Sequence, residues 1–125
     1  MAETILVVED QPIIRKCICD ALQKVGGYRV DEAGDGAQAL ELINARRFDL
    51  VISDFVMPRL DGVELLEHLR SVSPKTQIIF ITGYFSKDSL KAFLPGVECV
   101  TKPFGVDDLM SVVQRLLPPN GRQSL

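Results

Sequence analysis

Polar residues that could do chemistry follow four of the five apolar runs in this chain. They are Glu9, Asp10, Asp54, Thr82 and Lys102. Carboxylates about 4 Å apart repel by roughly 4 kcal/mol at an effective dielectric of 20, so such acids, if they meet, need a cation to stay ionised. Oxygen ligands without histidine or thiolate favour Mg²⁺, with Mn²⁺ as the alternative. A carboxylate beside Mg²⁺, a lysine and a threonine is, in outline, a phosphoryl acceptor site.

The residue types predict a role for each side chain at such a site. Asp54 would attack phosphorus as the nucleophile. Lys102 and the metal would neutralise charge on the phosphoryl oxygens, and positioning would supply most of the rate. Thr82 could donate its hydroxyl to a phosphoryl oxygen, while Gly83 keeps the mouth of the site free of bulk.

A second interpretation stays open for Asp10. An acid that follows a strand is often the N-cap of the next helix, and Asp10 taken alone fits that role as well as metal binding. The same explanation fails for Asp54, because Pro58 separates it from the next helix, which begins near Asp61.

The chain alternates two periodicities, which predict the elements that position these residues. Short apolar runs predict strands over 4–8, 28–33, 50–53, 77–81 and 97–100. Apolar residues spaced three and four apart predict helices over 14–25, 37–43, 65–72 and 106–116, and a shorter one over 86–94. Five such units predict an α/β doubly wound parallel sheet with helices on both faces. Its ligand site is expected at the carboxyl ends of the strands.

Length and composition exclude several classes of protein. A chain of 125 residues with 46% hydrophobic and 25% charged residues is typical of one globular domain, expected over 1–117, with a tail of linker composition over 118–125. The longest stretch without charge, 76–86, is too short to cross a bilayer, and an acid stands near the N-terminus where an export signal carries basic charge. We therefore expect a cytoplasmic protein with no membrane contact.

The net charge of −3 argues against nucleic-acid binding through a basic face. The three cysteines, Cys17, Cys19 and Cys99, form no CxxC pair, which argues against a disulfide framework or a zinc site. We expect Cys17 and Cys19 to be small buried hydrophobes of the first helix.

Six short motifs, in order and in register, resemble the receiver domain of bacterial two-component response regulators over residues 4–117. The motifs are ILVVED at 5–10, AGDG at 33–36, DFVMP at 54–58, DG at 61–62, ITG at 81–83 and KPF at 102–104. The resemblance implies a flavodoxin-like fold of five helices and five strands in the order 2-1-3-4-5. It also implies a cis Lys102–Pro103 bond.

The resemblance implies a phosphoacceptor switch. Asp54 would accept a phosphoryl group from a phosphohistidine on a sensor histidine kinase or phosphotransfer protein, and Lys102 would contact that group. Mg²⁺ would be held by Glu9, Asp10, Asp54 and the backbone carbonyl of Val56. The face made by the helix at 86–94, the strand at 97–100 and the helix at 106–116 would then control an effector or an output domain, and could form a homodimer.

Some residues depart from the commonest receiver pattern. Glu9 stands where Asp is more usual, which lengthens the arm to the metal by one methylene. Val56 offers no polar group to guide an attacking water, and Tyr84 could overhang the site and exclude water. We therefore expect a long-lived phosphate on Asp54.

Cys99 is a further departure, at a position where receivers usually carry an aromatic side chain that turns inward on activation. A cysteine cannot make that movement. We therefore expect the conformational signal from Thr82 to be weakened, or to pass through Tyr84 or Phe85 in place of the usual aromatic side chain.

Three other functions fit the same residues less well. A phosphatase of the haloacid-dehalogenase type needs a second Asp at the position of Val56 and a cap domain, so we expect catalysis only of the chain's own phosphorylation and dephosphorylation. A flavodoxin-like cofactor binder needs a phosphate-binding loop where Glu9 and Asp10 would repel phosphate. A degenerate receiver that serves only as a docking module is also possible, but the complete set of acids with Thr82 and Lys102 disfavours it.

Overall fold

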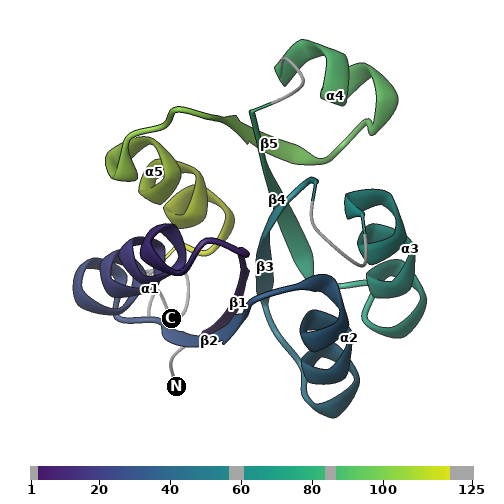
Figure 1. Cartoon of the computed structure of the whole chain (residues 1–125), viewed down its shortest axis with the longest axis horizontal. Helices are drawn as coiled ribbons and strands as arrows, with labels where there is room; N and C mark the ends of the chain where they lie inside the picture. The colour runs from purple at the N-terminus through teal and green to yellow at the C-terminus, as the bar shows by residue number, and fades with distance from the viewer. Residues whose placement is uncertain (1–2, 57–60, 84–86, 119–125) are drawn as a thin grey trace.

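Five strands alternate with five helices in the computed structural model, which describes residues 3–56, 61–83 and 87–118 (Figure 1). The strands are β1 Thr4–Val8, β2 Arg29–Ala33, β3 Leu50–Asp54, β4 Gln77–Thr82 and β5 Glu98–Thr101. The helices are α1 Pro12–Gly26, α2 Gly36–Ala45, α3 Gly62–Val72, α4 Lys87–Phe93 and α5 Val106–Leu116. Apart from Pro118, the predicted tail lies outside the described residues. Within them, no helix combines the length and the apolar composition that a bilayer crossing needs.

The strands form one parallel sheet in the order β2-β1-β3-β4-β5, which confirms the predicted fold. Three strands, β3, β4 and β5, extend one residue further than predicted, because Asp54 is paired with Ile81, and Thr82 with Thr101. Both candidate site residues are therefore the last residues of hydrogen-bonded strands rather than members of loops. That placement restrains their backbone, and hence the direction of their side chains.

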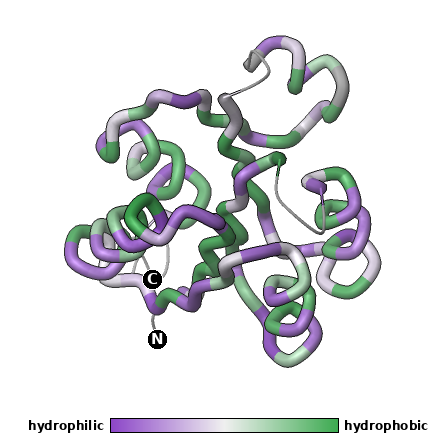
Figure 2. Tube along the Cα trace, in the orientation of Figure 1, coloured by the Kyte–Doolittle hydropathy of each residue, from purple (hydrophilic) through white to green (hydrophobic). Residues whose placement is uncertain are grey.

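Helices cover both faces of the sheet, α1 and α5 on one face and α2, α3 and α4 on the other (Figure 1). Alternate residues of β1 supply the two apolar cores: Ile5 and Val7 face α1 and α5, whereas Leu6 and Val8 face the other layer. Hydrophobic residues accordingly predominate in the strands at the centre of Figure 2. Because β2 is an edge strand, it has exposed polar residues, Arg29 and Glu32.

Helix boundaries follow local signals in the chain. Asp35 caps α2 by accepting a hydrogen bond from the Gln38 N–H at 2.9 Å. Asp61 caps α3 in the same way, with the Glu64 N–H at 2.9 Å. Gly27 ends α1 with φ 68°, a left-handed conformation that glycine adopts without steric cost.

The prediction that both cysteines of α1 are buried was wrong for Cys17. Cys19 is buried, whereas Cys17 is exposed. Successive helix residues are turned by about 100°, so the two cysteines lie on opposite sides of the buried Ile18. The side with Cys19 lies near Glu32 of β2, where burial raises the pKa of the Cys19 thiol to about 12.

Phe55 anchors the chain just after β3. Its ring packs edge-on against Phe80, with centroids 5.1 Å apart, and its N–H donates to the Ile81 carbonyl at 2.8 Å. Its own carbonyl accepts from the Gly62 N–H at 2.9 Å. A Cβ atom on Gly62 would lie 2.5 Å from Phe55 Cδ1 and 3.0 Å from Phe55 O, so only glycine allows this approach. The contact fixes both ends of the loop that leaves Asp54.

We predict that Gly62→Ala destabilises the protein by roughly 1–3 kcal/mol, because the added methyl group displaces Phe55. Alanine is otherwise favoured over glycine inside a helix by about 1 kcal/mol, so a net loss measures the clash. Urea unfolding followed by circular dichroism checks this. Gly83→Ala is the control, since its Cβ would meet Lys102 Cβ at an ordinary 3.5 Å. Equal unfolding midpoints for the two variants would contradict the prediction.

Candidate functional site

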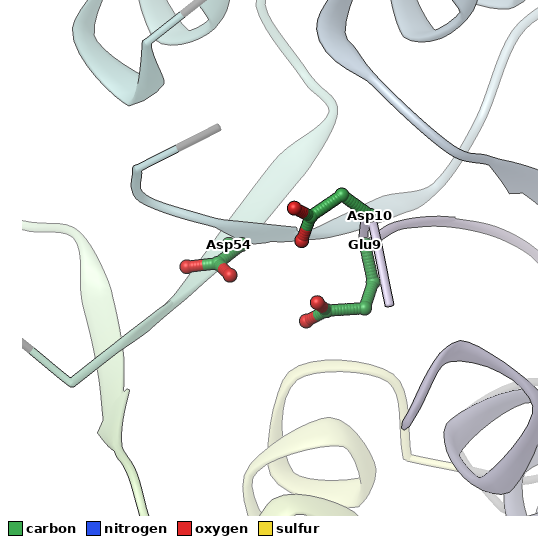
Figure 3. A group of neighbouring side chains, drawn as sticks. All are labelled: Glu9, Asp10 and Asp54. Carbon is green, nitrogen blue, oxygen red and sulfur yellow. The ribbon is translucent and has the colours of Figure 1, made fainter. Parts of the chain in front are cut away.

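The predicted site residues meet at the carboxyl edge of the sheet. Glu9 and Asp10 follow β1, Asp54 ends β3, Thr82 ends β4 and Lys102 follows β5. The carboxylates of Glu9, Asp10 and Asp54 face a common space (Figure 3). One oxygen from each lies within 4.8 Å of the other two. The sequence spacing therefore predicted correctly that these three acids converge.

Lys102 brings a cation into this group of acids. Its Nζ lies 2.9 Å from Asp54 Oδ2, within hydrogen-bond distance, and 3.9 Å from Glu9 Oε1. The Lys102 N–H donates to the Thr82 carbonyl at 2.7 Å, which ties the ends of β4 and β5 together. The Lys102–Pro103 bond is cis, as the sequence predicted.

Burial distinguishes the acids. Glu9 is 1% exposed and Asp54 6% exposed, whereas Asp10 is exposed to solvent. Thr82, at 1% exposure, is buried beside them at the end of β4. Two nearly buried carboxylates and one exposed carboxylate make a site that is open to water on one side only.

The two oxygens of Glu9 have different surroundings. Oε2 accepts a hydrogen bond from the Gln11 N–H at 3.2 Å. Oε1 is buried and has no hydrogen-bond partner among the described residues. A buried carboxylate oxygen without a donor is costly unless a ligand satisfies it. The donor set of three carboxylates suits a hard divalent cation such as Mg²⁺, so the residues present fit the metal that the sequence predicts.

Burial and neighbouring charges shift the pKa values of Glu9 and Lys102. Burial raises the pKa of Glu9 to about 7, and the charge of Asp54 adds to this, whereas the Gln11 N–H and Lys102 oppose it. Burial alone would lower the pKa of Lys102, but the hydrogen bond and charge of Asp54, together with Glu9 and Asp10, raise it. Lys102 is therefore a permanent cation at neutral pH.

The interpretation of Asp10 as a helix cap was wrong. Helix α1 begins at Pro12, with Gln11 in the N-cap position and no side-chain cap hydrogen bond. The backbone N–H of Gln11 is instead held by Glu9. Asp10 is thereby left to point at the space it shares with Asp54 (Figure 3).

The remaining predicted residues are placed less fully. Val56 follows β3 by two positions and its side chain is 45% exposed, while the role of its carbonyl as a metal ligand stays a prediction. Cys99 is buried in β5, in the apolar core that also contains Leu90 of α4. Tyr84 and Phe85 lie outside the described residues.

Sequence reasoning missed Arg15. Its Nη1 donates to the backbone carbonyl of Glu9 at 2.8 Å, and its Nε donates to Glu32 Oε1 at 3.0 Å. The only sequence signal is an arginine one helical turn after the acidic pair, which by itself does not distinguish it from a solvated surface arginine.

Comparison with known proteins agrees with the geometry. The family model of the response regulator receiver domain matches residues 5–114. The chain is 32% identical to Sporulation initiation phosphotransferase F of Bacillus subtilis (strain 168), over 94% of this chain and 96% of that protein. The solved structure of Chemotaxis response regulator CheY4 of Vibrio cholerae is similar, with a TM-score of 0.82, 32% identity and coverage of 93% of this chain and 99% of that one.

Other relatives are longer than this chain. Probable transcriptional regulator ycf29 of Porphyra purpurea is 36% identical over 94% of this chain, which spans 57% of that protein. Sensor kinase CckA of Brucella abortus (strain 2308) is 38% identical over 91% of this chain, which spans 12% of that protein. The same fold thus occurs both nearly alone and as one part of larger proteins.

We predict that the metal-free protein loses stability as pH rises from about 4.5 to about 7. The folded chain keeps the Glu9 proton up to about pH 7, while an unfolded carboxyl releases it near 4.5. Between these values the folded state binds more protons, so the free energy of unfolding falls with pH. The stabilisation from the Glu9 proton is complete below about pH 4.5 and is lost above about pH 7. The Glu9→Gln variant should therefore have a larger free energy of unfolding than the wild type at pH 8, by on the order of 3 kcal/mol at most.

Urea unfolding in EDTA at pH 4.5, 6 and 8 measures this difference. Glu67→Gln, on the exposed side of α3, is the control for the loss of one carboxylate charge. A constant difference between Glu9→Gln and the wild type at all three pH values would contradict the prediction.

Proposed function

Because the chain belongs to the family of response regulator receiver domains, we propose that it is the phosphoacceptor switch of a two-component pathway, with Asp54 as the acceptor. The observation that carries this proposal is the Asp54 carboxylate, nearly buried at the end of β3, with Lys102 Nζ 2.9 Å away and two further acids beside it. A structural ion pair alone needs neither of these additional acids. A phosphoryl acceptor needs these additional acids, because it must bind a cation as well as the phosphoryl group.

The proposed reaction is transfer of a phosphoryl group from a phosphohistidine to Asp54. A carboxylate oxygen of Asp54 forms the new P–O bond as the P–N bond to the imidazole breaks, and the electron pair of that bond stays on the imidazole nitrogen. Lys102 neutralises charge on the phosphoryl oxygens. Glu9, Asp10, Asp54 and the Val56 carbonyl would hold Mg²⁺, which when bound neutralises further phosphoryl charge.

Exposed apolar side chains support a protein as the phosphodonor. Ile13, in the first turn of α1, is 80% exposed, Val106 at the start of α5 is 41% exposed, and Val56 is 45% exposed. All three belong to segments at the carboxyl edge of the sheet, around the acids. A sensor histidine kinase or a phosphotransfer protein that covered them would bring its phosphohistidine to Asp54 and bury apolar surface in doing so.

The output would pass from Thr82 to the α4–β5–α5 face. Thr82 donates its hydroxyl to a phosphoryl oxygen, and its backbone carbonyl is bonded to the Lys102 N–H, so a shift of β4 is felt at the end of β5. Cys99 is too small to signal by a large rotamer change, so the switch works through another residue, Tyr84 or Phe85. The altered face controls an effector or an output domain and can serve as a homodimer interface.

The other predicted properties follow from the same assignment. The receiver domain is proposed to extend over 1–117, followed by a tail, and to act in the cytoplasm without binding nucleic acid or membrane. It catalyses only its own phosphorylation and dephosphorylation. We disfavour a phosphorylation-independent docking module because the acids, Thr82 and Lys102 are all gathered at one edge. We disfavour a phosphatase with Asp54 as nucleophile because Val56 stands where such an enzyme needs a second Asp.

We predict that incubation with acetyl phosphate and Mg²⁺ adds one phosphoryl group to the chain, seen by intact-mass spectrometry, and that Asp54→Asn abolishes the gain. Asp61→Asn is the matched control, because asparagine still caps a helix and Asp61 is exposed. Lys102→Ala should slow phosphorylation while Mg²⁺ binding is kept or tightened, since a positive charge leaves the site.

Two results would count against these assignments. Failure of the wild type to gain mass at saturating Mg²⁺ would favour the docking module. Loss of Mg²⁺ binding in Lys102→Ala would show that the lysine has a different role.

We also predict a phosphoryl group on Asp54 that outlasts seconds by a wide margin, because Val56 presents no polar group to orient a hydrolytic water. Val56→Gln should speed its loss by roughly tenfold or more. Release of labelled phosphate from the purified protein in Mg²⁺ measures the rate. Val72→Gln, a substitution at an exposed valine of α3, should leave it unchanged. Loss of the label within seconds in the wild type would refute the expectation.

A further inference from the structure

Arg15 connects the turn after β1 with the edge strand β2 at the carboxyl edge of the sheet. From the first turns of α1, its Nη1 donates to the Glu9 carbonyl at 2.8 Å and its Nε donates to Glu32 Oε1 at 3.0 Å. The Arg15 side chain is only 22% exposed. A Cβ atom on Gly34 would lie 3.3 Å from Nη1, so the small residue after β2 leaves room for the guanidinium. The contact is thus built from three segments of the chain.

The carbonyl that Arg15 holds belongs to the residue with the unpartnered buried oxygen. The Glu9 N–H donates to Ala33 O at 3.1 Å, and Glu9 Oε2 accepts from the Gln11 N–H at 3.2 Å. Arg15 adds a charge-assisted bond on the third polar group of the same residue. With these groups held, Glu9 Oε1 is left facing Lys102, 3.9 Å away, and the other acids.

We infer that Arg15 is a positioning residue for the cation site: by fixing the Glu9 peptide it sets the direction of the Glu9 carboxylate. Glu32 orients the guanidinium for this task. The inference rests on the proposed function, because it assigns a role toward the cation that Glu9, Asp10 and Asp54 would bind. Arg15 itself cannot be a ligand, since a guanidinium has no lone pair to donate to a metal.

Charge and geometry predict opposite results when Arg15 is removed. A positive charge near the acids repels a divalent cation, so its loss should tighten binding if only charge matters. If Arg15 positions Glu9, its loss should weaken binding despite the more negative site. Groups that orient metal ligands typically contribute a factor of about 10–100 in affinity. The sign of the change therefore separates positioning from simple electrostatics, and from a salt bridge that serves stability alone.

The experiment is titration of the full chain with Mg²⁺ by calorimetry at pH 8. Arg15→Met keeps an unbranched side chain over the inner positions of the arginine and removes its donors, and should raise the Kd by roughly tenfold or more. Lys16→Met makes the same charge change at an exposed neighbour and should leave the Kd equal or slightly lower. Arg15→Lys keeps the charge but has no fork to bridge both partners, and should restore affinity only in part.

A readout without metal accompanies the titration. In the metal-free protein, the backbone amide signals of Asp10 and Gln11 should shift in Arg15→Met and not in Lys16→Met. Circular dichroism verifies that each variant is folded, and if Arg15→Met is not, Arg15→Lys decides.

Each outcome bears on the inference. If the wild type binds Mg²⁺ and Arg15→Met binds it with an equal or lower Kd, the inferred role of Arg15 is overturned and the proposed function stands. Arg15→Lys is judged in the same way if Arg15→Met does not fold. A wild-type chain that binds no Mg²⁺ overturns the proposed function and this inference together.

Discussion

Repulsion among three carboxylates is the constraint on which the functional edge of this protein depends. Glu9 and Asp10 come from the turn after β1 and Asp54 from the end of β3, yet each places an oxygen within 4.8 Å of the other two. Such crowding is unfavourable, and the fold must supply the free energy that maintains it. Lys102 offsets part of the repulsion through its contact with Asp54, whereas burial in the first place, and the charge of Asp54 in addition, raise the pKa of Glu9 to about 7. A site whose negative charge is only partly neutralised attracts a cation.

The free energy comes from the apolar layers beneath the site. β1, β3 and β4 are buried on both faces, and their parallel pairing brings their carboxyl ends to one edge. Asp54 belongs to the last paired position of β3, and Phe55 immediately after it is locked between Phe80 and Gly62. Asp54, the proposed acceptor, therefore lies at a rigid strand end, and its freedom to relax away from the neighbouring acids is small.

Individual groups at this edge serve two purposes. The Oε2 atom of Glu9 accepts a hydrogen bond from the Gln11 N–H, and its Oε1 atom has no hydrogen-bond partner among the described residues. The bonded N–H belongs to Gln11, the N-cap residue of α1, which makes no side-chain cap hydrogen bond. Lys102 likewise joins β5 to β4 through its backbone and reaches Asp54 through its side chain, so the cation beside the proposed acceptor is anchored to β5, the strand of the proposed output face. The local backbone and the site chemistry cannot be altered independently.

Local patterns in the sequence determined the elements, the helix caps and the edge at which the acids gather. Asp35 and Asp61 were predictable as caps because a cap depends on residues three positions apart, and the acids converge because strand ends in a parallel sheet share an edge. The strand order itself came from the resemblance to receiver domains, since periodicity carries no information on which strands are neighbours. Only the tertiary structure decided that Cys19 is covered and Cys17 is not, that Asp10 caps no helix, and that Arg15 holds the Glu9 carbonyl. These outcomes depend on the separation and direction of groups in different elements, and such distances are set by packing rather than by spacing along the chain.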